Sequence, residues 1–209
     1  MDDSGILQRS FNVGINPRQE GLFPVSGLSL FGNDHPVILE IGSGKGRFLL
    51  ETAKSRPEVN VIGIEKSLHF YRVIVRRIEH SGLRNVRIIN YDAVPVMAEM
   101  LPARSVRELH IYFPDPWPRK REQKRRMIRP EAVRQMGRVI ELDGWGVYVT
   151  DHREYFEASL PLLREQFEVE VSADDERTAR TNYEAKYREE GRPIFEVRFR
   201  LPRGADFGK

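Results

Sequence analysis

The sequence predicts an α/β protein whose strands form a doubly wound, mostly parallel sheet of seven strands. Short apolar runs of strand length alternate with segments of helical period between residues 37 and 201. Strands that alternate with helices indicate βαβ units, and right-handed crossovers then place helices on both faces of the sheet. A glycine-rich turn follows the first strand. In such folds, ligands bind at the carboxyl ends of the strands, where the strand order reverses.

The predicted strands are short apolar runs that end at glycine, proline or polar residues. We expect them at residues 37–41, 61–64, 86–89, 109–113, 145–150, 167–171 and 194–201. The helices show apolar residues three and four positions apart, as at Leu68, Tyr71, Ile74, Val75 and Ile78. We expect helices at residues 47–55, 67–80, 94–101, 130–140 and 155–166.

The length of 209 residues predicts one folded domain with short additions. Residues 1–36 are rich in Gly, Pro and Asn and lack a sustained period, which predicts an irregular N-terminal arm. Part of this arm should pack down through Phe11, Phe23, Leu28 and Phe31. Residues 37–201 form the predicted domain, and residues 202–209 a polar tail that we expect to fray.

The composition excludes several kinds of site. The chain has no cysteine, which removes disulfides, cysteine-ligated zinc, iron–sulfur clusters and thiolate nucleophiles. Its five histidines lack metal-ligand spacing, so we expect no metal. No uninterrupted apolar run exceeds three residues, and no signal-peptide pattern opens the chain. We therefore expect a cytoplasmic protein without membrane contact.

One segment dominates the charge distribution. The net charge is +3, yet residues 119–129 hold seven basic side chains and one acid, so this segment carries +6 and the rest −3. A nearly neutral body with one dense basic segment indicates a polyanionic partner such as nucleic acid. A solvated surface loop is the alternative.

The turn after the first predicted strand carries Gly42, Gly44 and Gly46, which allow a tight turn and close approach of a ligand. Arg47 stands where a dinucleotide-binding turn would have its third glycine. Glu65 ends the second strand, 21 residues after Gly44, where an acid accepts hydrogen bonds from ribose hydroxyls. The pattern predicts an adenosine-type ligand, and the glycine spacing favours S-adenosylmethionine over NAD.

Two further acids have two interpretations each. Asp92 follows the third strand, where a side chain would lie beside an adenine, but it could equally cap the following helix. Glu40 could hold the amino group of the ligand through an ordered water, or it could stabilise the glycine turn by accepting backbone N–H bonds.

The segment after the fourth strand, residues 113–118, holds three prolines in five residues, which stiffen the backbone and prevent a helix. Asp115 would face a substrate there, and Trp117 could stack on a base or wedge the turn onto the core. Asp151 ends the fifth strand and should lie at the same edge. Residues 180–187 form a polar, aromatic insertion, either a solvated loop or a functional one.

These residues together resemble the bacterial tRNA (guanine-N7-)-methyltransferases over approximately residues 37–201. The matching motifs are Glu-Ile-Gly-x-Gly-x-Gly from Glu40, Gly63-Ile64-Glu65, Asp92-Ala93, Phe113-Pro114-Asp115-Pro116-Trp117 with the basic run, Thr150-Asp151 with Tyr155, and Thr181-x-Tyr183-Glu184. The resemblance implies a Rossmann-like class I methyltransferase fold. It also implies methyl transfer from S-adenosylmethionine, leaving S-adenosylhomocysteine, to N7 of a guanine in the tRNA variable loop, at position 46 of tRNA numbering.

The resemblance also implies residue roles. The cofactor-binding residues would be Glu40, Gly42, Gly44, Gly46, Glu65, Asp92, Ala93 and Asp115, with Asp115 also the catalytic carboxylate. The substrate-binding residues would be Arg119, Asp151, Thr181, Asn182, Tyr183 and Glu184. Arg119 stands where the family commonly has Lys, and Glu122 and Gln123 interrupt the basic run where the family often has His. The implied partner is tRNA, with the protein a monomer or a homodimer.

Guanine N7 carries a lone pair and no proton, so the reaction requires positioning more than a strong base. Methylation leaves positive charge on the guanine, and a carboxylate on its N1–H and N2–H edge would bind more tightly as the reaction proceeds. Asp115 or Asp151 could be that carboxylate. Three other functions compete with this one, namely methylation of another substrate, RNA binding without catalysis, and NAD-dependent oxidoreduction.

Overall fold

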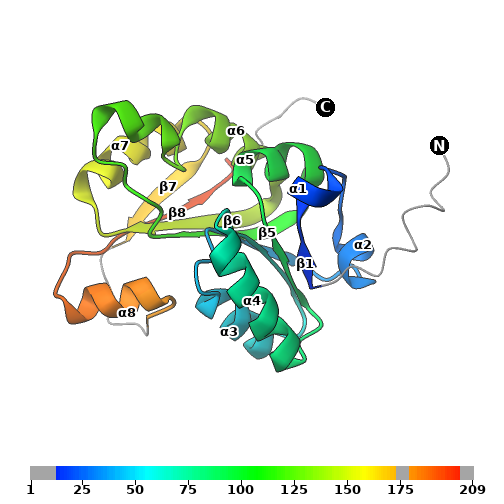
Figure 1. The fold of residues 1–209 in the computed structure, drawn as a ribbon. Coiled ribbons are helices and arrows are strands. Elements are labelled where there is room, and N and C mark those ends of the chain that lie inside the picture. Colours follow the sequence, from blue (N-terminus) through cyan, green and yellow to red (C-terminus); the bar gives the residue numbers. More distant parts are fainter. Residues whose placement is uncertain (1–12, 173–178, 203–209) are drawn as a thin grey trace.

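The computed structural model describes residues 13–172 and 179–202, and it confirms the α/β fold (Figure 1). Eight strands form one sheet in the order β1-β4-β3-β2-β5-β6-β8-β7. Their bounds are β1 Gly14–Ile15, β2 Val37–Ile41, β3 Asn60–Ile64, β4 Val86–Ile89, β5 Val106–Tyr112, β6 Ile140–Thr150, β7 Glu168–Ser172 and β8 Phe195–Arg200. The seven predicted strands are all present, and the eighth, β1, comes from the N-terminal arm.

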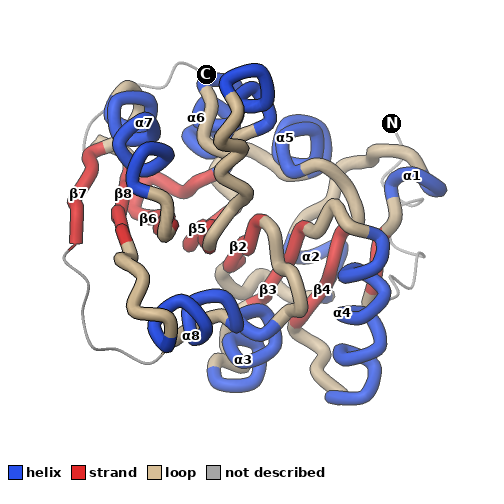
Figure 2. Tube along the Cα trace, turned by 60° about the vertical axis from the view of Figure 1, so that its left-hand side comes forward, coloured by secondary structure: helices blue, strands red, loops and turns tan. Residues whose placement is uncertain are grey.

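Helices cover both faces of the sheet (Figure 2). One face carries α5 (Ala93–Pro95), the π-helical turn η2 (Val96–Met100), α6 (Pro130–Val139) and α7 (Arg153–Arg164). The other face carries α3 (Arg47–Ser55), α4 (Leu68–Ser81) and α8 (Asn182–Glu189). The five predicted helices are confirmed, although the one expected at residues 94–101 is divided between α5 and η2.

The predicted insertion at residues 180–187 is largely helical rather than a loop. Thr181 has an extended backbone and its hydroxyl accepts a hydrogen bond from the Glu184 N–H (3.0 Å), which caps α8. The sequence did not predict this helix, because α8 buries few apolar side chains and its sequence has no apolar stripe.

The sheet topology determines where a ligand can bind. Strands β1, β4, β3, β2, β5 and β6 are parallel to one another. Strand β8 runs in the opposite direction and pairs antiparallel with both β6 and β7. The register pairs Ile41 of β2 with both Ile64 of β3 and Ile111 of β5, so these strands end side by side. The chain leaves β2 toward β3 on one side and returns to β5 on the other, which makes the β2–β5 boundary the switch point of the fold.

The core has two main parts, one on each face of the sheet. Alternate residues of β2 separate between them, with Leu39 under the α6 side and Ile38 under α3 and α4. Strands buried on both faces read as continuous apolar runs, which is why the central strands were visible in the sequence.

The described part of the N-terminal arm is more regular than the sequence predicts. Besides β1 it contains α1 (Pro17–Glu20) and α2 (Gly27–Phe31). Phe23 and Phe31 pack against the core as expected, but Leu28 is 62% exposed, so that prediction was wrong. Phe11 and residues 203–209 lie outside the described residues. The division of the chain at residues 36 and 201 stays a prediction.

Within the described ranges, the structure contains no helix that is both long enough and apolar enough to cross a membrane. Residues 13–172 and 179–202 also contain no group of three or more His, Cys, Asp or Glu side chains that could hold a metal ion.

Gly46 and Gly32 provide a matched test of backbone strain and packing. Both are left-handed, with φ of 74° and 73°, but a Cβ on Gly46 would lie 2.9 Å from Ile74 Cγ1, whereas nothing lies within 4 Å of one on Gly32. We expect Gly46→Ala to lower the free energy of unfolding by about 1–3 kcal/mol more than Gly32→Ala, because overpacking adds to a shared backbone cost. Urea unfolding without ligand measures this, and equal losses would contradict it.

Candidate active site

The turn between β2 and α3 holds three glycines in left-handed backbone, with φ of 79° at Gly42, 51° at Gly44 and 74° at Gly46. A Cβ on Gly42 would meet nothing within 4 Å, and one on Gly44 would meet only the Tyr183 ring, at 3.9 Å. The backbone at Gly42 and Gly44 is therefore open to a ligand. Gly46 differs, because the space beside it is filled by Ile74 of α4.

Glu65 follows β3 and is tied to this turn. One oxygen of its carboxylate accepts from the Gly44 N–H (2.8 Å) and the other from the Ser67 N–H (2.7 Å). Burial raises the pKa of Glu65, and the charge of Asp115 raises it further, while the hydrogen bonds from Ser67 and Gly44 lower it. The net pKa is raised, and the acid stands where the sequence analysis placed a ribose acceptor.

Glu40 is 2% exposed, and its Oε2 atom has no hydrogen-bond partner in the described protein. Burial raises its pKa from the ordinary 4.5 to about 7, with the Ser43 hydroxyl lowering it and the Glu65 charge raising it. A buried oxygen without a partner is costly. This favours the first of the two interpretations of Glu40, a contact to a cationic group of the ligand, over a bond to the turn.

Asp92 caps the helix that follows it, which is one of its two interpretations. The other, a position beside an adenine, stays a prediction. Its Oδ1 accepts from the Val94 N–H (3.2 Å), which caps α5, and its Oδ2 pairs with Lys66 (2.9 Å). Burial alone would raise the pKa of Asp92, but Lys66, the Val94 N–H and the charge of Arg129 outweigh it and the pKa is lowered. Ala93, the next residue, is buried at the start of α5.

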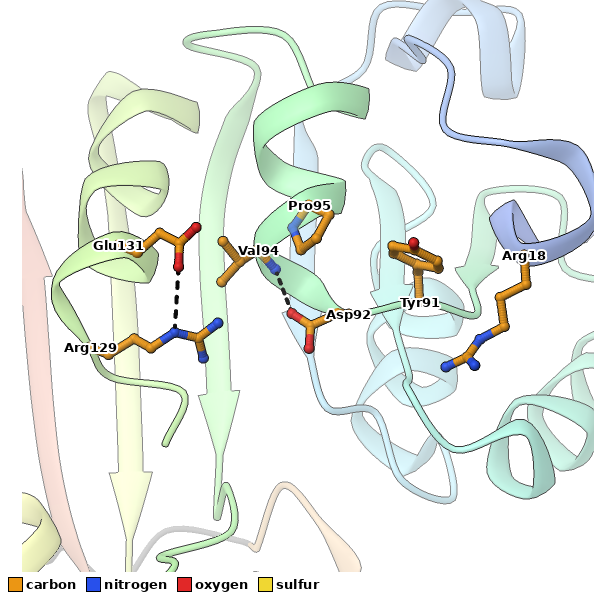
Figure 3. A pocket seen from close by; sticks show the side chains of 7 residues that line it. All are labelled: Arg18, Tyr91, Asp92, Val94, Pro95, Arg129 and Glu131. Carbon is orange, nitrogen blue, oxygen red and sulfur yellow. Dashed lines mark hydrogen bonds and ion pairs between the residues drawn. The ribbon is translucent and has the colours of Figure 1, made fainter. Parts of the chain in front are cut away.

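A pocket of about 410 Å³ opens beside Asp92 (Figure 3). Figure 3 shows the Tyr91 ring between Asp92 and Arg18, with Arg129 on the opposite side. Arg18 belongs to α1, so the N-terminal arm reaches the edge of the predicted adenine site. Nothing in the sequence indicated that contribution.

The proline-rich turn after β5 presents Asp115 to solvent between two strained residues. Phe113 and Trp117 have φ of 49° and 42°, backbone angles that residues other than glycine rarely adopt. Such backbone costs about 1–3 kcal/mol per residue and persists where the surroundings impose it, frequently at functional sites. Trp117 is half-buried under the guanidinium of Arg125, 4.9 Å from its ring centroid, and it belongs to neither main core cluster.

Asp151 follows β6, and its carboxylate accepts from Arg192 (3.0 Å). The Arg192 guanidinium also lies 4.5 Å from the centroid of the Tyr187 ring, and this ring packs edge-on against Phe113 at 5.3 Å. These contacts bring α8 to the edge where Asp115 and Asp151 lie.

The four residues at the start of α8 and its N-cap that are implied as substrate-binding divide into two pairs. Asn182 and Tyr183 are exposed, with Tyr183 47% exposed beside the glycine turn. Thr181 caps the helix, and Glu184 is 0% exposed and pairs with Arg180 at 3.1 Å. The hydrogen-bonding atoms of Thr181 and Glu184 are thus engaged within the protein.

The basic run forms the 3₁₀-helix η3 (Lys120–Arg125), called the basic helix below. The exposed cations of the run are Arg119, Lys120, Arg121, Lys124 and Arg125. Arg126 differs from them, because it is buried.

Solved structures share this fold at low sequence identity. The 16S rRNA methyltransferase KamB matches with a TM-score of 0.63 and 16% identity over 83% of this chain and 91% of its own. The [4+2]-cyclase SpnF matches with a TM-score of 0.58 and 15% identity over 85% of this chain and 79% of its own. The fold is therefore that of class I methyltransferases, and since a cyclase also uses it, the chemistry must be argued from the site.

The Methyltransf_4 family model, described as a putative methyltransferase, matches residues 34–197. The fold and this match define the chain as an S-adenosylmethionine-dependent methyltransferase. A tRNA (guanine-N(7)-)-methyltransferase of Nitrosococcus oceani is 33% identical over 86% of this chain and 78% of its own length. The chain belongs to the tRNA (guanine-N(7)-)-methyltransferase family. It spans 55% of the Thermus thermophilus relative (36% identical over 81% of this chain) and 59% of the Thermotoga maritima one (32% over 87%).

We expect Glu40→Gln to change the pH dependence of stability. The raised pKa means that folded Glu40 keeps its proton while the unfolded chain loses it, so wild-type stability falls as pH rises from 4.5 to about 7. Gln does not titrate, so its advantage over Glu should grow across this window by up to about 3 kcal/mol. Urea unfolding at pH 4 and pH 8 without ligand measures the difference, and parallel pH profiles would refute it.

Proposed function

We propose that this chain transfers the methyl group of S-adenosylmethionine to N7 of a guanine in the tRNA variable loop. The observation that carries the proposal is one edge of the sheet on which the glycine turn, an exposed Asp115 and the basic helix follow one another. Family membership supports the reaction and the acceptor. Since tRNA is the acceptor, we expect the protein to work in the cytoplasm.

The residues at the edge fit S-adenosylmethionine. The unpartnered Glu40 oxygen suits the amino group of the methionine part, and the open backbone at Gly42 and Gly44 suits the close approach of that part. Glu65 would accept from the ribose hydroxyls, exchanging one of its backbone hydrogen bonds for them. Asp92 and Ala93 would lie along the adenine.

When bound, the sulfonium group supplies a methyl that N7 accepts through its lone pair, with the C–S bond electrons remaining on sulfur. Asp115 is the better placed of the two acids to meet the N1–H and N2–H edge of the guanine. Among the described residues, no hydrogen bond or ion pair is found for its carboxylate, whereas that of Asp151 is paired with Arg192. The negative charge of Asp115 would stabilise the positive charge that methylation creates on the guanine.

The RNA would be held on both sides of Asp115. The exposed cations of the basic helix suit the phosphate backbone, which fixes register without reading sequence. On the other side, Tyr183 presents an aromatic face for stacking and Asn182 a side-chain amide for hydrogen bonding. Thr181 and Glu184 would act indirectly, by fixing the helix that carries these two residues. The Asp151–Arg192 pair would hold the same helix against the edge.

The function is tested with labelled S-adenosylmethionine and two unmodified tRNA transcripts, with guanine or adenine at the variable-loop position. We expect label only in the guanine transcript and, after borohydride and aniline treatment, chain cleavage at that base. Incorporation without cleavage would exclude N7, and absence of incorporation with the donor bound would exclude tRNA as the acceptor.

We expect Asp115→Asn to lower kcat by about 100-fold or more, because it removes the charge that stabilises the methylated guanine. Affinity for S-adenosylmethionine, measured by calorimetry, should fall by a smaller factor than kcat, because Asp115 would be one of several residues that contact the donor. Asp143→Asn is the control, since Asp143 is exposed and pairs with Arg107 away from the strand ends that form the site. An Asp115→Asn enzyme with full kcat would remove the electrostatic role.

A further inference from the structure

Two neighbouring arginines at the end of the basic helix have opposite surroundings. The Arg125 guanidinium covers one face of Trp117 from the exposed surface. Arg126 is 6% exposed and points into the protein. The two residues carry the same charge and are adjacent in the sequence. Of the two, Arg125 is accessible to a phosphate and Arg126 is not.

Arg126 makes contacts with two elements at once. Its Nε atom donates a hydrogen bond to the backbone carbonyl of Pro116 (2.8 Å), the residue that follows Asp115. Its guanidinium lies over the ring of Tyr155 in α7, 4.7 Å from the centroid. The Tyr155 hydroxyl in turn accepts from the Ile128 N–H (2.9 Å). A single side chain therefore joins α7 and the end of the basic helix to the turn that carries Asp115.

The burial of this cation calls for a physical reason. A charged side chain out of water is unfavourable unless its partners compensate. Within residues 13–172 and 179–202, the one carboxylate found paired with Arg126 is that of Glu154, at 3.8 Å. Its Nη2 atom has no hydrogen-bond partner in the described protein. An arginine held in this way contributes less to charge balance than to geometry, because its planar fork fixes the carbonyl and the ring relative to each other.

The turn it holds is strained. Trp117 adopts φ of 42° immediately after Pro116, and such a conformation persists only where neighbouring contacts impose it. The Arg126 bond to the Pro116 carbonyl and the Arg125 contact to the Trp117 ring are two such contacts, one from inside and one from outside.

We propose that Arg126 is a positioning residue that fixes the Asp115 carboxylate for methyl transfer, while the exposed cations beside it bind the RNA. The inference rests on the proposed function, because it assigns Asp115 a role in that reaction. It removes Arg126 from the set of phosphate-binding residues to which its place in the basic run would assign it.

The test compares Arg126→Gln with Arg121→Gln, the same substitution and the same loss of charge on an exposed residue of the basic helix. Arg126→Gln should lower kcat by about 10- to 100-fold and leave the KM for tRNA and the slope of log Kd against log salt as in wild type. Arg121→Gln should instead leave kcat as in wild type, raise the KM for tRNA and reduce the slope of log Kd against log salt by about one. A reduced salt slope with unchanged kcat in Arg126→Gln would overturn the proposal.

Fluorescence reports the turn itself. The chain has two tryptophans, so Trp145→Phe leaves Trp117 as the single tryptophan, which can be excited selectively over the tyrosines. In that background Arg126→Gln should shift Trp117 emission to the red and increase its quenching by acrylamide, and Arg121→Gln should not. Identical spectra for the two variants would count against a positioning role.

Arg126→Lys provides the rescue and covers the case in which Arg126→Gln fails to fold. An ammonium group can still donate to the Pro116 carbonyl but cannot lie flat on the Tyr155 ring, so kcat should be restored in part. No restoration in a folded Lys variant would overturn the proposal. A wild-type enzyme inactive on the guanine transcript would instead overturn the proposed function, so the two failures are distinguishable.

Discussion

Five parallel strands end at one edge of the sheet, and this alignment gathers acidic side chains that repel one another. Glu40 lies just before the end of β2, and four more acids follow strand ends within three residues, namely Glu65, Asp92, Asp115 and Asp151. The protein offsets the repulsion locally, with Lys66 on Asp92, Arg192 on Asp151 and backbone N–H groups on Glu65. Among the described residues, no hydrogen-bond partner is found for the Oε2 atom of Glu40, and burial raises the pKa of this acid. The edge thus favours a ligand with a positive charge, as a sulfonium donor with its ammonium group provides.

The basic helix stands beside this acidic edge with the opposite sign. Two neighbouring regions of opposite charge can hold two different ligands, a cation at the strand ends and a polyanion along η3 (Lys120–Arg125). The turn of Asp115 is the boundary between them. Its prolines restrict the backbone, and Phe113 and Trp117 have φ of 49° and 42°. Among the described residues, no ion pair is found between the Asp115 carboxylate and the cations that follow it in the sequence.

Much of this arrangement could be predicted from the sequence, because the relevant physics is local or periodic. The central strands are apolar on both faces, and the apolar residues of α4 recur at helical spacing. The glycine turn and the prolines require particular backbone conformations. Side-chain roles that depend on distant partners could not be predicted. The resemblance implies a substrate contact for Glu184, and that role stays a prediction, but the sequence did not indicate its burial or its ion pairs with Arg180 and Arg188. In the sequence, Arg126 cannot be distinguished from the exposed basic residues beside it. Its burial depends on contact with Tyr155, which belongs to another helix, α7. Helix α8 was missed because polar contacts rather than an apolar stripe hold it.

The way α8 is held has a consequence for the site. Arg180 pairs with Glu184 at the start of the helix and with Glu196 of β8 (2.8 Å), and it covers the ring of Tyr112 at the end of β5. The base of the helix is therefore fixed to the same strand that leads to Asp115. Breaking a buried ion pair leaves an uncompensated charge, so displacing the start of α8 from β8 is unfavourable. The exposed Tyr183 and the Asp115 turn are thus attached to the same part of the sheet. A base inserted between them would meet two surfaces whose separation is set before it binds, and the reaction at N7 requires that kind of preorganisation more than it requires a strong base.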